Sequence, residues 1–329
     1  RRRGLLAGIG IANYVETPVG APIEWAQVKV LAEGRVEVAV GTQSSGQGHE
    51  TTFAQVLADR LGITPEEVKL ITGDTRIVAA GGGTHSDRSM RMAGKVLVEA
   101  SDNIVAQARK IFAALVGAAE DDVVFDDGLL SAPRSNLRLG LFDLARAIKS
   151  DGALPAALRQ PLVSEARYVG RIPAYPTGAA LCEVEIDPET GVVRIVRYTT
   201  VDDAGQPINP MILDGQTHGG IVQGAGQALS EAVIHDPQSK QVVSASFMDY
   251  GLLRADMLPS FSVELVEDPT SGNPLRVKGG GEAGITPALG AVMNAVVDAL
   301  SVYGIEHLEM PATPARVWAA IQASGKTAR

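Results

Sequence analysis

Hydrophobic and polar residues alternate along the first part of the chain in a way that predicts strands. Val36, Val38 and Val40 alternate with polar or small residues, and another apolar stretch, 25–31, lies just before them. A period of two is typical of strands that are buried on one face. The two stretches are joined through Glu33-Gly34, so the pattern predicts a β-hairpin.

Apolar residues at steps of three and four predict helices further along the chain. The first helix follows Gly48 and ends at Gly62, because glycine suits a helix C-terminus. The longest is expected over 90–115. A third is expected over 211–229, where frequent glycines indicate close packing against another element or a ligand.

The second half opens with another predicted hairpin, formed by 180–187 and 192–200. Between the halves, residues 153–161 are rich in Ala, Pro and Leu and show no periodicity. We therefore predict two domains, 1–155 and 156–329, which share an order of hairpin, polar loop and glycine-containing helix.

Composition narrows the class of protein. The chain has 329 residues, of which 45% are hydrophobic, so it can bury a sizeable core. A formal charge of −9 argues against a nucleic-acid or anionic-membrane partner and favours a small-molecule substrate. Cys182 is the only cysteine, which excludes internal disulfides and cysteine-rich metal sites. We expect it to be a small core residue.

Membrane and targeting signals are not expected from the sequence. No segment looks like an uninterrupted membrane span, and the N-terminus lacks the pattern of a signal peptide, so we expect a cytoplasmic protein. The chain begins with Arg1-Arg2-Arg3 instead of methionine, which indicates a piece of a longer polypeptide or a processed chain.

The loop 41–48 carries the first candidate chemistry, because a glycine-rich polar loop leads directly into a helix. The first turn of a helix has unpaired N–H groups, and glycines let an anion approach the backbone. The loop matches neither the phosphate-binding loop nor the dinucleotide fingerprint. A zinc site of the form His-Glu-x-x-His is excluded, since Phe53 stands where the second histidine belongs. The alternative is a solvated loop with a well-capped helix.

A second candidate is Glu282, the one carboxylate in a run of glycines and small residues. Little side-chain bulk surrounds it, so a substrate or cofactor could come close. A helix is predicted over 288–300, with Thr286 as its cap and Pro287 at its first position. The alternative for Glu282 is that it only complements the positive end of this helix.

Together these segments resemble one family, the molybdenum hydroxylases, which include xanthine dehydrogenase, aldehyde oxidoreductase and aerobic carbon monoxide dehydrogenase. The resemblance rests on 46–55, on 83–90, on 209–227 and on 278–284, in this order along the chain. It covers essentially the whole chain but only the C-terminal half of that family's molybdopterin-binding large subunit. With the element pattern, it implies an α+β fold of two α/β-type subdomains with mixed sheets flanked by helices.

The resemblance assigns site residues by their place in the matching motifs. Glu282 is similar to the catalytic glutamate of the family. The loop 84–87 departs from the usual family form, which has small or aromatic residues there. The residues that resemble cofactor contacts are Gln47, Gly48, His49, Thr51, Ser86, Arg88, Ser89, Gln216 and Gln223.

The resemblance also implies the chemistry and the partners. It implies hydroxylation of a carbon centre in an aldehyde, a purine or an N-heteroaromatic compound, with water as oxygen donor and Glu282 as general base. The molybdenum is held by the pterin, in its cytosine dinucleotide form, so no side chain is expected to ligate metal. Iron–sulfur clusters and FAD are expected on partner subunits, and the N-terminal half of the large subunit completes a dimer of heteromers.

Three alternatives stay open at this point. The chain could be a non-catalytic molybdopterin-binding module or inactive paralogue, or a fragment of a carbon monoxide dehydrogenase large subunit. It could also be an unrelated phosphate-binding α/β protein if the glycine loops are taken in isolation. Residues 248–254 are candidates either for a substrate funnel or for a structural strand.

Overall fold

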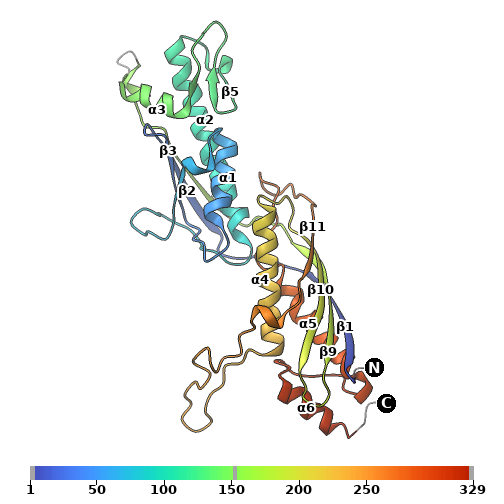
Figure 1. The fold of residues 1–329 in the computed structure, drawn as a ribbon. Helices are drawn as coiled ribbons and strands as arrows, with labels where there is room; N and C mark the ends of the chain where they lie inside the picture. The colour runs from blue at the N-terminus through green and yellow to red at the C-terminus, as the bar shows by residue number, and fades with distance from the viewer. Residues whose placement is uncertain (1–3, 151–153, 326–329) are drawn as a thin grey trace.

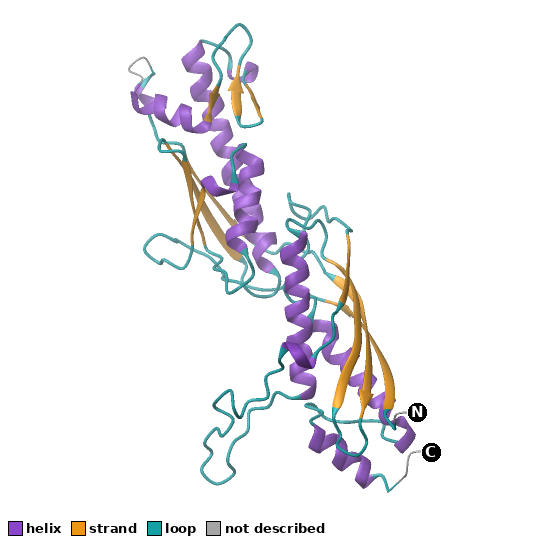
Figure 2. Cartoon of the chain, viewed as in Figure 1, coloured by secondary structure: helices purple, strands orange, loops and turns teal. Residues whose placement is uncertain are grey.

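The computed structural model describes residues 4–150 and 154–325, which form two lobes placed end to end (Figure 1). Each lobe has a four-stranded sheet with helices packed on it, as the secondary-structure view shows (Figure 2). Both sheets contain antiparallel and parallel pairs, so the predicted α+β class with mixed sheets and flanking helices is confirmed.

The sheet of the first lobe has the order β4-β3-β2-β8. Strands β2 (Ile23–Leu31) and β3 (Arg35–Val40) form the predicted hairpin. Strand β8 (Val163–Val169) pairs antiparallel with β2, and β4 (Val68–Ile71) runs parallel to β3.

Helices α1 (His49–Leu61) and α2 (Gly94–Val116) pack against each other and against this sheet. Helix α1 ends at Gly62 as predicted, because that glycine adopts the left-handed conformation of a helix C-cap. A π-helical turn, Ser89–Ala93, leads into α2, so the predicted long helix begins with a widened first turn. This turn borders the second lobe.

A smaller unit closes the far end of the first lobe (Figure 1). It consists of the short strands β5 (Val124–Asp126), β6 (Leu129–Ser131) and β7 (Leu139–Gly140), followed by helix α3 (Leu141–Ser150). Single helical turns occur at Pro65–Glu67, Glu120–Asp122, Ala156–Leu158, Ala255–Met257 and Ser301–Tyr303.

The sheet of the second lobe has the order β1-β9-β10-β11. Strand β1 (Leu6–Val15) pairs antiparallel with β9 (Thr177–Ile186), which forms the second predicted hairpin with β10 (Val193–Asp203). Strand β11 (Ser262–Val266) runs parallel to β10. Cys182 lies on β9 and is fully buried, as predicted for a core residue, and burial raises the pKa of its thiol to about 12.

Three helices belong to the second lobe: α4 (Pro210–Leu229), α5 (Ile285–Leu300) and α6 (Pro314–Ala323). The predicted helix over 211–229 is therefore confirmed, with Asn209 as its N-cap: the Asn209 side chain accepts a hydrogen bond from the Ile212 N–H at 3.0 Å. The predicted cap at Thr286 is wrong, because α5 begins at Ile285, two residues before the predicted first position, and its N-cap is Gly284. The Thr286 hydroxyl instead donates back to the Glu282 carbonyl at 2.8 Å.

Strand pairing crosses the division predicted between residues 155 and 156. Strand β1 comes from the N-terminal part of the chain but pairs in the sheet of the second lobe. Strand β8 lies after the predicted boundary but pairs in the sheet of the first lobe. Each lobe is therefore built from two separate stretches of chain, because sheet pairing brings together strands that the local pattern cannot connect.

Helix α5 forms the core of the second lobe by packing directly on β1. A side chain at Gly10 would overlap the Ala291 carbonyl and the Ala295 amide of the helix, and Gly8 is equally confined. The segment Ile285–Tyr303 is long and apolar enough, by length and composition, to cross a membrane, so the expectation that no segment reaches that length is wrong. Its packing against β1, β9 and α4 accounts for its apolar character as a core helix.

A long loop between α4 and β11 extends away from the second lobe (Figure 2). Phe247 and Met248 lie on it with exposed fractions of 88% and 93%. The alternative that 248–254 form a structural strand is wrong, because the segment consists of turn and loop. Neighbouring large apolar side chains with such exposed fractions are unusual on the surface of a protein that has no binding partner there.

We expect Gly10→Val to destabilise the chain by about 3 kcal/mol, because the added side chain must push α5 away from β1. Chemical denaturation, followed by circular dichroism, measures this change. Gly219→Ala is the matched control: it lies within α4 with no atom near its added methyl, so it should stabilise by roughly 0.5–1 kcal/mol. Equal effects from both substitutions would contradict the packing described here.

Candidate functional site

A pocket of about 270 Å³ lies between the two lobes. Residues 47–52 and 84–90 of the first lobe and residues 204–216 and 277–282 of the second contribute its walls. These are the segments that the sequence singled out, so the structure brings all of them together. The volume is slightly below the roughly 300–1,000 Å³ of typical small-molecule sites.

Hydrogen bonds across the pocket hold the lobes together. The Asn209 side-chain amide donates to Gln55 Oε1 at 3.1 Å, and the Gln216 amide donates to the Gly46 carbonyl at 3.3 Å. Both bonds connect the start of α4 with the loop and helix around His49. The glycine-rich loop is therefore fixed from the second lobe as well as from its own.

The start of α1 presents a helix N-terminus to the pocket. Gly48 is the N-cap in the left-handed conformation, and no side chain caps the helix. Gln47 lines the pocket, and its Oε1 accepts a hydrogen bond from the Ser45 N–H at 2.6 Å. Uncapped N–H groups at a helix start favour an anionic ligand.

His49 lines the same pocket and is almost fully buried, with 5% of its surface exposed. Its ring stacks on Phe53 with 4.8 Å between the centroids. Burial lowers the pKa of His49, so the imidazole is neutral near pH 7. Its Nδ1 is sealed from solvent and has no hydrogen-bond partner among the described residues. A buried polar atom without a partner at a pocket wall is a place for a ligand group.

Two consecutive residues in the loop before α2 adopt a strained backbone. Ser86 and Asp87 have φ values of 47° and 51°, which non-glycine residues seldom adopt and which cost about 1–3 kcal/mol each. Arg91 holds both of them, because its guanidinium donates to the Asp87 carbonyl at 2.9 Å and to the Ser86 carbonyl at 3.2 Å. The same group also donates to the Ile172 carbonyl, which lies beyond strand β8.

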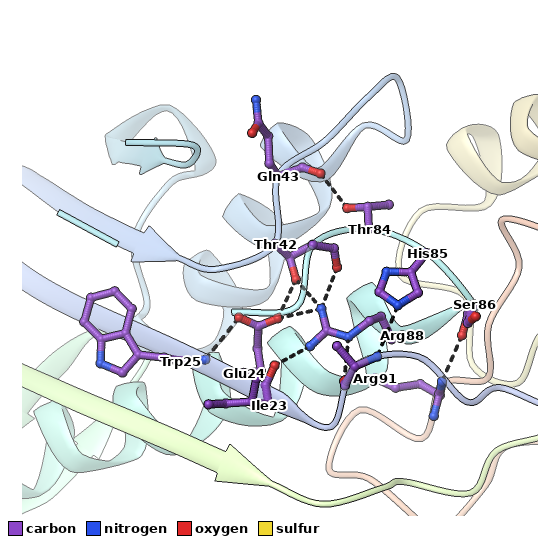
Figure 3. Close-up of polar contacts among 12 residues, drawn as sticks. Ile23, Glu24, Trp25, Thr42, Gln43, Thr84, His85, Ser86, Arg88 and Arg91 are labelled. Atoms are coloured by element: carbon purple, nitrogen blue, oxygen red, sulfur yellow. Dashed lines mark hydrogen bonds and ion pairs between the residues drawn. The ribbon is translucent and has the colours of Figure 1, made fainter. Parts of the chain in front are cut away.

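Arg88 is fully buried beside this loop, and its guanidinium is used entirely by the chain itself (Figure 3). It forms an ion pair with the buried carboxylate of Glu24 at 2.8 Å. It also donates to the Ala21 carbonyl at 3.1 Å and to the Ile23 carbonyl at 2.6 Å. The prediction that Arg88 contacts the cofactor is corrected here, since the residue does not line the pocket and supports its wall from behind.

Glu282 extends into the pocket from the glycine-rich loop before α5. Its Oε1 accepts a hydrogen bond from the Ser86 N–H at 3.0 Å, and its own N–H donates to Asp87 Oδ1 at 3.1 Å. The strained residues of the first lobe therefore fix both the backbone and the carboxylate of Glu282. The glycines beside it make this possible, because a side chain at Gly279 would overlap Asp87.

A third carboxyl group, Glu16, stands next to Asp87 and Glu282. Burial and these two neighbours raise the pKa of Glu16 to about 10. Burial also raises the pKa of Asp87. Within the described residues, no group of three or more His, Cys, Asp or Glu is placed to hold a metal ion, so this cluster is not a metal site.

The remaining predicted site residues differ in whether they line the pocket. Ser86 reaches Glu282 through its N–H and does not line the pocket, and Gly48 serves as the helix cap. Thr51 is exposed outside the pocket, and Gln223 is exposed two turns along α4 from Gln216. The predicted residues that line the pocket are Gln47, His49, Ser89, Gln216 and Glu282.

Several pocket residues were missed by sequence reasoning. Thr52 lines the pocket in place of its neighbour Thr51, because the helix turns that position inward. Lys278 is the one Lys or Arg among the lining residues, and it pairs with Asp203 and, at 3.1 Å, with Asp268. Glu16 lies outside the lining of the pocket, and nothing in the sequence marked it.

This arrangement defines a class of protein: a two-lobed domain with a pocket between its lobes that suits a small anionic ligand. Comparison with known sequences agrees, since residues 1–259 match the family described as "Molybdopterin cofactor-binding domain". The chain therefore belongs to the molybdopterin cofactor-binding domain of molybdenum hydroxylase large subunits, as its motifs indicated.

Individual relatives support this membership. The chain is 33% identical to the 6-hydroxypseudooxynicotine dehydrogenase complex subunit gamma of Paenarthrobacter nicotinovorans, over 100% of the chain and 41% of that protein. It is 35% identical to the nicotine 6-hydroxylase large subunit of the same organism, over 96% of the chain and 40% of that protein. The chain thus spans about two fifths of the length of these relatives.

Among solved structures, a crystal structure of Cu,Mo-CO dehydrogenase in its carbon monoxide reduced state superimposes with a TM-score of 0.88. The sequence identity is 31%, and the match covers 98% of this chain and 42% of that chain. The two-lobed arrangement is therefore shared with a molybdenum enzyme. The alternative of an unrelated phosphate-binding protein is excluded by this agreement in sequence and fold.

We expect Arg88→Met to destabilise the chain by about 3–5 kcal/mol, because it leaves the Glu24 carboxylate buried without its cation. Urea denaturation measures the loss in free energy of unfolding. Arg197→Met is the matched control, since the Arg197–Glu183 pair lies at the surface and should contribute less than about 1 kcal/mol. A loss from Arg88→Met no larger than this control would refute the supporting role of the buried pair.

Proposed function

We propose that the chain binds the molybdenum cofactor in the inter-lobe pocket and is the catalytic portion of an oxidoreductase that hydroxylates a carbon centre, with water as the oxygen donor. The observation that carries this proposal is the Glu282 carboxylate, which reaches the pocket and is oriented by the Ser86 N–H at 3.0 Å. A carboxylate fixed in this way can accept a proton from a reacting group.

Several features of the pocket fit the cofactor. The uncapped start of α1 suits a phosphate, and the unpartnered Nδ1 of His49 can bond to a polar group of the ligand. On α4, Gly215 and Gly219 have open space where side chains would stand, on either side of Gln216. We assign this bare helix surface to the cofactor, and its cytosine dinucleotide form would extend along it.

The chain's own contribution is positioning and proton transfer. When bound, the cofactor would supply the two-electron redox centre, and water is the source of the oxygen atom that is transferred. Glu282 would accept the proton that the oxygen donor gives up, and the Ser86 N–H stabilises the negative form of the carboxylate beforehand. The strained loop keeps that N–H in place, so the base does not have to reorient during the reaction.

The electrons must leave through other polypeptides. Cys182 is buried in β9 and is the only cysteine, so iron–sulfur clusters and FAD would belong to partner subunits. The exposed loop with Phe247 and Met248 is an apolar surface that the N-terminal half of the large subunit would cover. The assembly we propose is a dimer of heteromers, in line with relatives that are named as subunits of complexes.

We expect Glu282→Gln to retain molybdenum and to lose turnover by at least about 100-fold, because the amide cannot take up the proton. The measurement is made on the complex purified through a tag on this chain, by metal analysis and by dye reduction with a panel of aldehydes, purines and N-heteroaromatic compounds.

The matched control is Glu189→Gln, an exposed carboxylate in the turn between β9 and β10 and outside the pocket. It should keep both molybdenum and activity. Full activity of a molybdenum-loaded Glu282→Gln enzyme would reject the role of this residue. Molybdenum without turnover in the wild-type complex, over the whole panel, would instead favour the non-catalytic binding module.

The form of the cofactor has a separate test. Acid treatment of the purified complex should release cytidine monophosphate in a one-to-one ratio with molybdenum, because the dinucleotide form carries this nucleotide. Mass spectrometry of the released material identifies it. Molybdenum accompanied by another nucleotide, or by none, would reject the cytosine dinucleotide form while leaving the assignment of Glu282 untouched.

A further inference from the structure

Two carboxylate oxygens beside Glu282 are buried without any hydrogen-bond donor: Oε2 of Glu16 and Oδ2 of Asp87. Buried polar atoms in folded proteins almost always have a partner. The Glu16 and Asp87 side chains lie within hydrogen-bond reach of each other, so both cannot be ionised at low cost, and one proton between them relieves the repulsion and supplies the missing donor. The geometry therefore requires a proton at this place.

Asp87 also has a direct hold on Glu282. Its other oxygen, Oδ1, accepts the Glu282 N–H at 3.1 Å, and its side chain fills the space that Gly279 leaves free. The backbone of Asp87 is fixed in turn by Arg91. Glu16 is placed by the sheet of the second lobe, because its N–H continues the β1 ladder by donating to the Pro176 carbonyl at 3.0 Å.

We propose that Glu16 and Asp87 are a positioning pair that shares one proton and fixes the backbone and the charge environment of Glu282. The assignment of Glu282 rests on the function proposed above, whereas the shared proton does not. Neither Glu16 nor Asp87 contacts the substrate in this scheme. They act through Glu282, by keeping its N–H engaged and by limiting the negative charge next to its carboxylate.

The charged and titratable groups around the pair support a single shared proton. Arg91 faces Asp87 and Glu16 from the π-helical turn and favours one negative charge. Glu282 faces them from the glycine loop and disfavours a second. Tyr14, on β1, is neutral because burial raises its pKa, and it donates to Asp202 at 2.8 Å, so it adds no charge.

The first test is the pH dependence of stability, which needs neither cofactor nor turnover. The pKa of Glu16 rises from 4.5 to about 10 on folding, so folding takes up a proton. Its stabilising contribution is complete below pH 4.5 and is lost as the pH rises towards 10. Glu16→Gln carries a neutral amide of the same shape and does not titrate. We expect its Tm, relative to wild type, to rise steadily between pH 5 and pH 9.

The control for this test is Glu189→Gln, whose Tm difference from wild type should be constant over the same range. A constant difference for Glu16→Gln as well would overturn the proposal. If Glu16→Gln does not fold, infrared spectra of the wild-type chain decide the question. The C=O stretch of a protonated carboxyl group should persist above pH 7, and its absence would overturn the shared proton.

The second test asks whether the pair acts on Glu282. In the purified complex, Asp87→Asn removes a negative charge but keeps an oxygen for the Glu282 N–H, so the acid limb of kcat/KM against pH should move to lower pH. Asp87→Ala also removes the acceptor, and its kcat should fall by a further 10- to 100-fold. A loss of activity in both variants with no movement of the acid limb would show a merely structural role. A pH-dependent Tm difference in a complex without molybdenum would instead reject the proposed function and keep the shared proton.

Discussion

The site depends on one constraint: the backbone of Ser86 and Asp87 is held in a conformation that these residues do not adopt on their own. Arg91 holds it by donating to both carbonyls, and the neighbouring Arg88 anchors the same loop through a buried ion pair with Glu24. The strain is tolerated because both buried guanidinium groups tie the loop to the rest of the lobe, Arg91 through the Ile172 carbonyl and Arg88 through the Ala21 and Ile23 carbonyls. As a result, the Ser86 N–H and the Asp87 Oδ1 of the first lobe both form hydrogen bonds with Glu282 of the second lobe.

The small residues of the glycine-rich loop around Glu282 are required by the same contact with the strained loop of the first lobe. From the sequence, its small residues were interpreted as room for a substrate or cofactor. In the structure, the space beside Gly279 is filled by Asp87, and that beside Gly280 by Leu213. These glycines allow two stretches of the chain to meet. On α4, by contrast, Gly215 and Gly219 have open space beside them, where a ligand can lie against a bare helix. The glycine pattern thus combines two physical causes that a sequence cannot separate.

The two hairpins and the long helices were predictable because each is encoded by its own local pattern, whereas strands β1 and β8 were not predicted. The hairpins, α1 with its stop at Gly62, and the long α2 all follow from alternation and helical spacing. The pocket residues His49, Gln216 and Glu282 were found because they sit in glycine-containing motifs. The role of Arg88 was misjudged, since burial of its guanidinium depends on Glu24, a residue 64 positions away. Glu16 had no motif, because its neighbours come from both lobes.

The crossing of the chain between the lobes has a consequence for its synthesis. Strand β1 is synthesised before the other described strands, yet its pairing partner begins only at Thr177. Until then the backbone N–H and C=O groups of β1 lack their partner strand. The first lobe, by contrast, can close as soon as β8 follows α3. Long-range pairing of this kind slows folding and exposes an apolar edge to other chains. Strand β1 therefore joins the sheet of its lobe only after every strand of the first lobe has been synthesised.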